Sequence, residues 1–243
     1  MSIAGSLGGI LFILIAANRH QQQIPVKKFN VAIDFTKALF FVSEDDVQTE
    51  FNNLFPDSAK RNIRNINLNA LEKLIESNPF VANAEVYADM KGEVFAEIVQ
   101  KEPLLRVINN NGVSYYLDIN GKKMPVSDNF TARVPVATGY IENTGNIERD
   151  SILQKQLFDV ISFIRKDTFL LALCEQIDVD DKGEMEVIPK LSMHRFLIGD
   201  AADLEGKFKR MKIFYNEIMK SDTVSSFTFV NLKFKNQIVC AKN

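Results

Sequence analysis

The residues whose types and spacing could bind a metal ion form one short run, Asp178-x-Asp180-x-Lys182-Gly183. Alternating carboxylates before a glycine are how a calcium-binding loop begins. Such a loop also needs an oxygen ligand where Lys182 stands and a bidentate glutamate where Pro189 stands. Neither residue can serve, so we interpret the run as a solvated hairpin turn between two strands.

Nucleophilic chemistry would have to come from two cysteines and two histidines. Cys174 and Cys240 lie far apart and form no CxxC motif. The apolar residues 171–173 predict that Cys174 is buried, and buried thiols are normally inert. The pair is compatible with an extracytoplasmic disulfide or with two reduced, buried thiols. His194 is the only histidine besides His20, so the sequence offers few residues for a two-histidine metal site or for a Cys–His pair.

Other signatures of catalysis are absent from the sequence. The chain has no glycine-rich phosphate loop and no G-x-S-x-G motif. Its net charge is −2 without a basic block, whereas a nucleic-acid surface needs clustered lysine and arginine. The sequence therefore predicts a protein that is not an enzyme, that has no cofactor or metal, and that binds neither nucleic acid nor a small-molecule substrate.

The N-terminus carries one apolar run, residues 3–17, which ends at Asn18-Arg19-His20. A membrane span needs about 20 apolar residues, with a lower limit near 17. A signal peptide should begin with basic residues, and a core helix should have a polar face. Since this run has neither, we expect residues 1–18 to form a single transmembrane anchor. Arg19 and Lys27 follow the run, and the positive-inside rule would place them in the cytoplasm.

Two folded units are expected after a linker, residues 19–28. The first shows a strand, two helices and two strands, with a capping pair at Ser43 and Asp46 that opens the first helix. The second begins with strand-and-turn signals, continues with a long amphipathic segment and a hairpin, and adds another helix before a final strand over residues 227–241. The expected fold is α+β, with a small domain over residues 29–103 and a larger mixed β domain with two helices over residues 104–243.

Several runs in these units resemble a known family. The end of the first unit is similar to a POTRA domain, in particular that of the bacterial cell-division proteins of the FtsQ/DivIB family. The second unit resembles the β domain of the same family. The runs that carry the resemblance are Asn78-Pro79-Phe80-Val81, Ala84-Glu85-Val86, Glu97-Ile98-Val99, Glu102-Pro103, Leu105-Arg106-Val107, Tyr116-Leu117-Asp118, residues 134–139 and residues 231–239.

The resemblance implies a non-catalytic scaffold of the division machinery. It implies a single-pass protein of the cytoplasmic (inner) membrane at the division septum, with a cytoplasmic N-terminus and the bulk of the chain in the periplasm. The implied partners are the coiled-coil proteins FtsB and FtsL, and through them the septal peptidoglycan synthase. A POTRA-type module that binds extended chains during outer-membrane assembly or secretion is the alternative. Such proteins carry a C-terminal barrel of many alternating strands, which this sequence lacks.

The final strand is where the resemblance places the main partner site. Leu232 and Phe234 alternate with Asn231, Lys233 and Lys235, which gives one face to the core and leaves the other in water. A last strand can end a sheet and either guard its edge with charge or accept a partner strand. The expected contact residues for FtsB are Phe229, Val230, Asn231, Leu232, Lys233, Phe234 and Lys235.

Overall fold

The computed structural model describes residues 24–57, 61–142, 145–190, 194–218 and 227–241. The chain divides into two compact units, Met1–Lys101 and Glu102–Asn243. Among the described residues, no helix has both the length and the apolar character that crossing a bilayer requires. The expected anchor, residues 1–18, lies outside the described residues.

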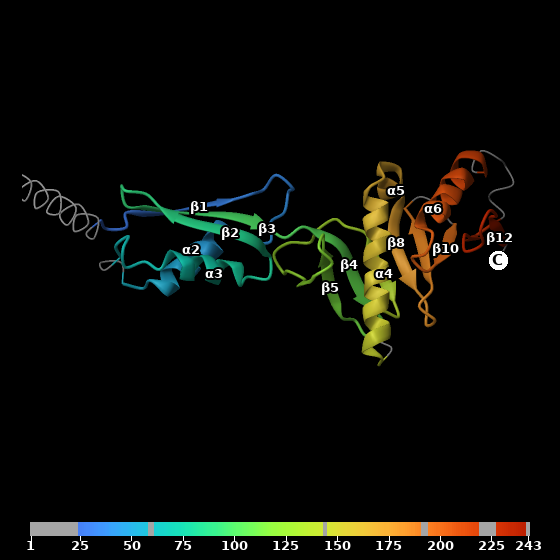
Figure 1. Cartoon of the computed structure of the whole chain (residues 1–243), viewed down its shortest axis with the longest axis horizontal. Coiled ribbons are helices and arrows are strands. Elements are labelled where there is room, and N and C mark those ends of the chain that lie inside the picture. The colour runs from blue at the N-terminus through green and yellow to red at the C-terminus, as the bar shows by residue number, and fades with distance from the viewer. Residues whose placement is uncertain (1–23, 58–60, 143–144, 191–193, 219–226, 242–243) are drawn as a thin grey trace, which may run out of the picture. The chain divides into compact units, whose positions relative to one another are not determined.

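The first unit is a three-stranded sheet with two helices on one face (Figure 1). Its strands lie in the order β1-β3-β2, with β3 parallel to β1 and antiparallel to β2. This arrangement confirms the predicted order of one strand, two helices and two strands. The elements are β1 (Lys28–Ile33), α2 (Glu44–Leu54), α3 (Leu68–Glu76), β2 (Val81–Ala88) and β3 (Glu93–Gln100).

Both helices of the first unit begin at a residue whose side chain caps the helix, Ser43 for α2 and Asn67 for α3. The Ser43 side chain accepts the N–H of Asp46, and the Asp46 carboxylate accepts the N–H of Ser43, so the predicted capping box is confirmed. Asn67 caps α3 by accepting the N–H of Ala70. Each helix then buries one apolar stripe against the sheet. The core residues of this unit include Val47, Phe51, Leu71, Ile75, Val94, Ala96 and Ile98.

Gln100 fixes the loop that leads into α2. Its buried Oε1 accepts the backbone N–H groups of Phe41 at 2.9 Å and Val42 at 3.1 Å. Its Nε2 donates to the carbonyl of Leu39 at 2.8 Å. One side chain thus satisfies three buried backbone groups that no strand or helix pairs, and leaving such groups unpaired costs about 1–3 kcal/mol each.

The second unit is a nine-stranded mixed sheet in the order β12-β11-β10-β9-β8-β7-β4-β5-β6. Its first five strands are β4 (Pro103–Asn109), β5 (Ser114–Asp118), β6 (Lys123–Pro125), β7 (Val136–Gly139) and β8 (Cys174–Val179). The others are β9 (Met185–Pro189), β10 (Arg195–Gly199), β11 (Phe229–Asn231) and β12 (Val239–Ala241).

Helices connect two of the three parallel strand pairs of this sheet, whereas β5 and β6 lie between the parallel neighbours β4 and β7. α4 (Ile147–Arg165) and α5 (Thr168–Leu173) lie between β7 and β8, and α6 (Leu204–Ile213) with a π-helical turn (Phe214–Ile218) lies between β10 and β11. Parallel strands require such crossovers. α4 is the predicted long amphipathic segment. Its apolar face is buried in the core cluster and consists of Leu153, Leu157, Val160, Ile161 and Ile164.

Two short elements of this unit depart from the prediction. The larger domain contains three α-helices in its described part, where two were expected, because Asp167 caps the six-residue α5. The three-residue β6 was not predicted either. Both are too short for periodicity to separate them from a loop. They form because Asp167 supplies a cap and β5 supplies a paired neighbour.

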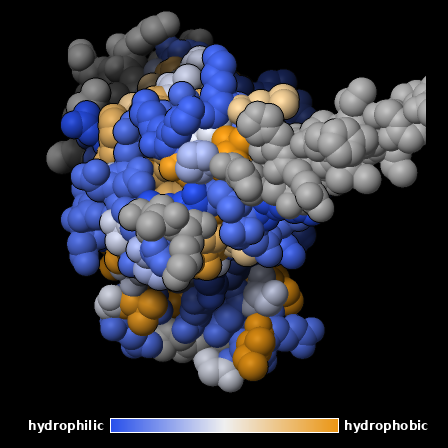
Figure 2. Space-filling model, turned by 90° about the vertical axis from the view of Figure 1, so that its left-hand side faces the viewer, coloured by the Kyte–Doolittle hydropathy of each residue, from blue (hydrophilic) through white to orange (hydrophobic). Residues whose placement is uncertain are grey.

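The molecular face in Figure 2 is mostly hydrophilic, and its hydrophobic residues occur in separate patches. Isolated apolar side chains are normal on a surface in contact with water.

Candidate partner-binding site

The C-terminal segment forms two short strands and a turn, so the prediction of one continuous strand over residues 227–241 is wrong. β11 pairs in parallel with β10 and antiparallel with β12. The chain leaves β11 after Asn231, turns through residues 232–238 and returns as β12, which is the last strand of the sheet. We call residues 229–241 the C-terminal hairpin. Within it β12 forms the edge of the described sheet, and β11 is hydrogen-bonded to a strand on each side, β10 and β12.

The hairpin divides the expected contact residues into three groups by their exposure. Val230 and Leu232 are buried in the core cluster, so a partner would meet them only through their backbone. Phe229 and Asn231 are half-buried. The exposed members lie on the turn: Lys233, Phe234 and Lys235. The structure thus gathers the accessible side chains at the turn and not along a strand.

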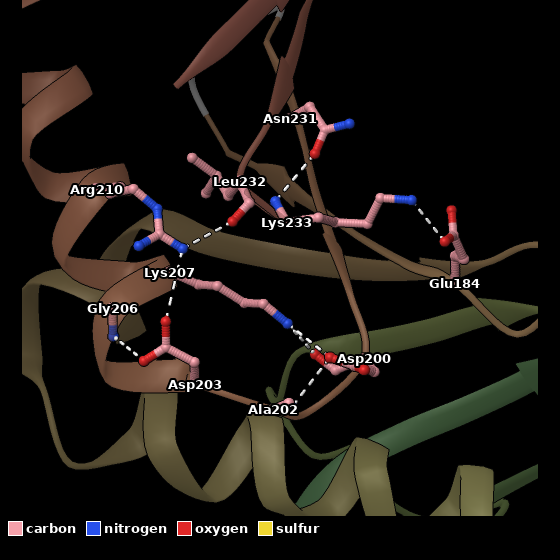
Figure 3. A network of polar contacts seen from close by, with 10 residues as sticks. All are labelled: Glu184, Asp200, Ala202, Asp203, Gly206, Lys207, Arg210, Asn231, Leu232 and Lys233. Atoms are coloured by element: carbon pink, nitrogen blue, oxygen red, sulfur yellow. Dashed lines mark hydrogen bonds and ion pairs between the residues drawn. The ribbon is translucent and has the colours of Figure 1, made fainter. Parts of the chain in front are cut away.

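The turn is held by hydrogen bonds to its first residues (Figure 3). The Leu232 N–H donates to the carbonyl of Leu197 at 2.9 Å, which continues the pairing with β10 for one residue. The Asn231 Oδ1 accepts the N–H of Lys233 at 2.9 Å, and this Asx turn directs the chain away from the sheet. From α6, the Arg210 Nη2 donates to the carbonyl of Leu232 at 2.8 Å. α6 therefore positions the start of the turn.

Lys233 is engaged within the chain. Its Nζ lies 2.6 Å from Oε1 of Glu184, which precedes β9. Its stem crosses Gly199, where a Cβ would meet Lys233 Cδ at 2.7 Å. Figure 3 shows Lys233 extended from the turn toward Glu184. The charge of Lys233 is thus partly neutralised, whereas Lys235 has no ion pair among the described residues.

A second ion pair stabilises the beginning of α6. The buried Lys207 donates from Nζ to Oδ1 of Asp200 at 2.7 Å and to its carbonyl at 2.9 Å. The hydrogen bond from Lys207 lowers the pKa of Asp200, and the N–H of Ala202 contributes in the same direction. Asp203 caps the helix by accepting the N–H of Gly206 at 3.2 Å. The N-terminal end of α6 is consequently fixed before the helix reaches the hairpin.

A groove of about 720 Å³ separates α6 from the turn. Its lining has three cationic side chains against one carboxylate, and Ile213 and Ile238 add apolar surface. Arg210 lies 3.8 Å from Asp203, which caps the same helix, so Lys209 and Lys235 supply the net positive charge of the groove. We call it the α6 groove. Its lining residues are Asp203, Gly206, Lys209, Arg210, Ile213, Lys235, Asn236, Gln237 and Ile238.

Sequence reasoning missed the contribution of α6. The charged residues Lys209 and Arg210 lie more than 20 positions before Lys235, so no local spacing connects them. The basic residues that follow Gly206 were the available signal. Only the parallel pairing of β10 with β11 shows that this helix and the turn share a groove.

The remaining candidates for chemistry lie in a turn or in the core. Asp180 accepts the N–H groups of Lys182 and Glu184, which confirms a hairpin turn at this run. Cys174 is 1% exposed, and burial raises the pKa of its thiol to about 12. His194 is buried with its ring 5.2 Å from Phe214. In the part of the chain that the structure describes, both cysteines are free and no three metal-binding side chains converge.

The fold and the matching family models indicate the same class of protein. The chain combines a POTRA-like unit with a larger β unit, and the family model described as POTRA-like domain matches residues 26–99. The family model described as FtsQ/DivIB, C-terminal related, matches residues 102–241. No curated protein matches the chain.

The second of these matches covers more than half of the 243 residues, and the chain therefore belongs to the FtsQ/DivIB family. This is a family of non-catalytic cell-division scaffolds that act through protein–protein interactions and are associated with the membrane at the division septum.

Proposed function

We propose that the chain is a membrane-anchored scaffold of the divisome that binds FtsB and FtsL. It links early and late division proteins to the septal synthase and so regulates septal peptidoglycan synthesis, without catalysing a reaction itself. The anchor is residues 1–18, the N-terminus is cytoplasmic, and the two folded units lie in the periplasm at the septum. The observation that carries the proposal is the family match over the unit that contains the C-terminal hairpin.

The outer edge of β12 supports a contact through the backbone. Among the strands that the structure describes, β12 pairs only with β11, and its residues Val239 and Ala241 are exposed. An edge strand can accept a partner segment whose backbone completes the ladder. Proteins that do not use such an edge usually guard it with charge, and β12 itself carries no charged side chain.

The α6 groove supports a contact through side chains. Its net positive charge suits a partner segment that carries carboxylates, and such complementarity contributes more to encounter rate and specificity than to affinity. Ile213 is 45% exposed at the groove and offers apolar surface to the same segment. In this arrangement FtsB adds backbone to β12 and places acidic side chains near Lys209 and Lys235.

Lys235→Glu in the full-length chain tests the side-chain contact. Lys235 has no ion pair among the described residues, so the variant should fold normally and weaken FtsB binding about fivefold or more, with a reduced dependence on salt. Lys233→Glu is a poorer probe because it also breaks the pair with Glu184. Lys122→Glu is the matched control, since Lys122 is exposed near β6 at the opposite edge of the sheet.

Hydrogen exchange tests the backbone contact. Amide exchange at β12 should slow when FtsB is added, while exchange at β6 should stay unchanged. Equal FtsB affinity of the Lys235→Glu variant and the wild-type chain, together with unprotected β12 amides, would move the binding site elsewhere.

Retention of the chain in the membrane fraction after an alkaline wash tests the anchor. Recovery of a mature chain that begins near Asn18 would instead indicate a signal peptide.

A further inference from the structure

The POTRA-like sheet has an outer face that its helices do not cover. α2 and α3 contact the opposite face, where the core of this unit lies (Figure 1). Strand register and alternation define the outer face. Its members are Lys28, Asn30 and Ala32 of β1, Asn83, Glu85 and Tyr87 of β2, and Glu93, Phe95, Glu97 and Val99 of β3.

Aromatic and apolar side chains lie on this face, on either side of the Glu85–Glu97 pair. Tyr87 lies directly opposite Phe95, and their rings stack with centroids 5.2 Å apart and planes inclined by 15°. Tyr87 is 45% exposed and Val99 is 46% exposed. The Tyr87 hydroxyl donates to Oε1 of Glu97 at 2.7 Å, which fixes the orientation of the ring. The result is a fixed aromatic platform that faces water.

Two glutamates border the platform at a cost to the fold. Glu85 lies directly opposite Glu97, and like charges in this position destabilise a sheet. Neither carboxylate forms an ion pair among the described residues. Glu93 differs, because Asn30 donates to it at 2.9 Å and Lys28 lies opposite it. The hydrogen bond to Glu97, followed by burial and the charges of Glu97 and Glu85, raises the pKa of Tyr87.

We propose that this outer face binds a basic segment of a partner protein. An arginine of that segment lies on the Tyr87–Phe95 platform and directs its guanidinium to Glu85 and Glu97. Arginine suits the site better than lysine, because its planar guanidinium stacks on aromatic rings and its several N–H groups can donate to two carboxylates at once. The uncompensated negative charge disfavours anionic lipid and nucleic acid. The proposal concerns a different unit from the C-terminal hairpin and does not depend on it.

The test uses the full-length chain and a fluorescent decapeptide of alternating arginine and alanine, followed by anisotropy at low and moderate salt. The double variant Glu85→Gln/Glu97→Gln should weaken binding about tenfold, since it removes both charged acceptors. The control Glu44→Gln/Glu50→Gln removes the same charge from the exposed side of α2 and should change binding less than about twofold.

A second pair of measurements separates stacking from charge alone. The wild-type chain should prefer the arginine peptide to the corresponding lysine–alanine peptide, and Tyr87→Leu should remove that preference. Equal losses in the two glutamine double variants would mean non-specific attraction and would overturn the proposal. Unchanged binding in Glu85→Gln/Glu97→Gln, with the variant folded by its melting temperature, would overturn it as well.

Discussion

The side chain of Lys233 lies across Gly199 so closely that a Cβ at Gly199 would meet Cδ of Lys233 at 2.7 Å and Cγ at 3.1 Å. Gly199 also has φ +70°, a conformation that costs other residues about 1–2 kcal/mol. The Lys233 Nζ is paired with Glu184, and this pair opposes a displacement of the stem. The end of β10 and the turn of the C-terminal hairpin are therefore packed as one structure.

Gly199→Ala should consequently lower the free energy of unfolding by about 2–3 kcal/mol in urea titrations, from backbone strain and the contact with Lys233. Gly112→Ala is the matched control, since Gly112 has φ +79° and open space around it. It should lower the free energy of unfolding only through the strain of a positive φ. Adding Lys233→Ala to Gly199→Ala should recover part of the loss. Full additivity of the two changes would contradict the contact.

Arg210→Met should loosen the C-terminal hairpin. The substitution keeps much of the aliphatic stem and removes the hydrogen bond to the Leu232 carbonyl, so the expected cost is about 1–2 kcal/mol. Faster amide exchange should be confined to β11 and β12. Lys209→Met, at an exposed position one residue earlier, should leave both stability and exchange unchanged. A uniform increase of amide exchange throughout the second unit would mean that Arg210 does not specifically stabilise the hairpin.

Glu186→Gln should raise stability at neutral pH. Burial raises the pKa of Glu186, with Arg195 opposing the shift and Asp178 and Asp180 adding to it. A carboxyl with a higher pKa in the folded chain destabilises the fold as pH rises above the unfolded value of about 4.3. The melting temperature of the variant should exceed that of the wild type at pH 7, and the difference should shrink to nothing near pH 3.5.

Asp200→Asn should show the opposite sign. The hydrogen bond from Lys207 lowers the pKa of Asp200, so this carboxylate stabilises the fold above the unfolded value of about 3.9, and the contribution is lost as pH falls. The variant should melt below the wild type at pH 7 and approach it in acid. Parallel pH profiles for Glu186→Gln and Asp200→Asn would contradict both assignments.

The two cysteines should differ in reactivity. Cys174 is buried and its pKa is raised to about 12, whereas Cys240 on β12 is only partly buried. An aromatic disulfide reagent should modify Cys240 in the native chain and reach Cys174 only on unfolding. Mass spectrometry of peptides locates the label. Rapid native labelling of Cys174, or isolation of a Cys174–Cys240 disulfide, would show that the described arrangement is wrong for this part of the fold.

Local sequence signals determined the elements whose causes are themselves local. The capping box of Ser43 and Asp46, the Asp180 turn and the apolar stripe of α4 each depend on residues within one or two turns of chain. Such interactions can be inferred without knowledge of neighbours. The same holds for the burial of Cys174, which its apolar neighbours indicate. The order of elements in the first unit follows from these signals.

Tertiary structure alone decided the candidate surfaces. The alternation around Leu232 and Phe234 is compatible with an extended strand, but the Asx turn at Asn231 and the hydrogen bond from Arg210 to Leu232 end the strand and turn the chain. The α6 groove combines residues distant in sequence, and the meeting of Glu85 with Glu97 depends on strand register. A shift of one residue would reverse every side chain. Period and propensity describe one segment at a time, whereas these sites arise from pairing between segments.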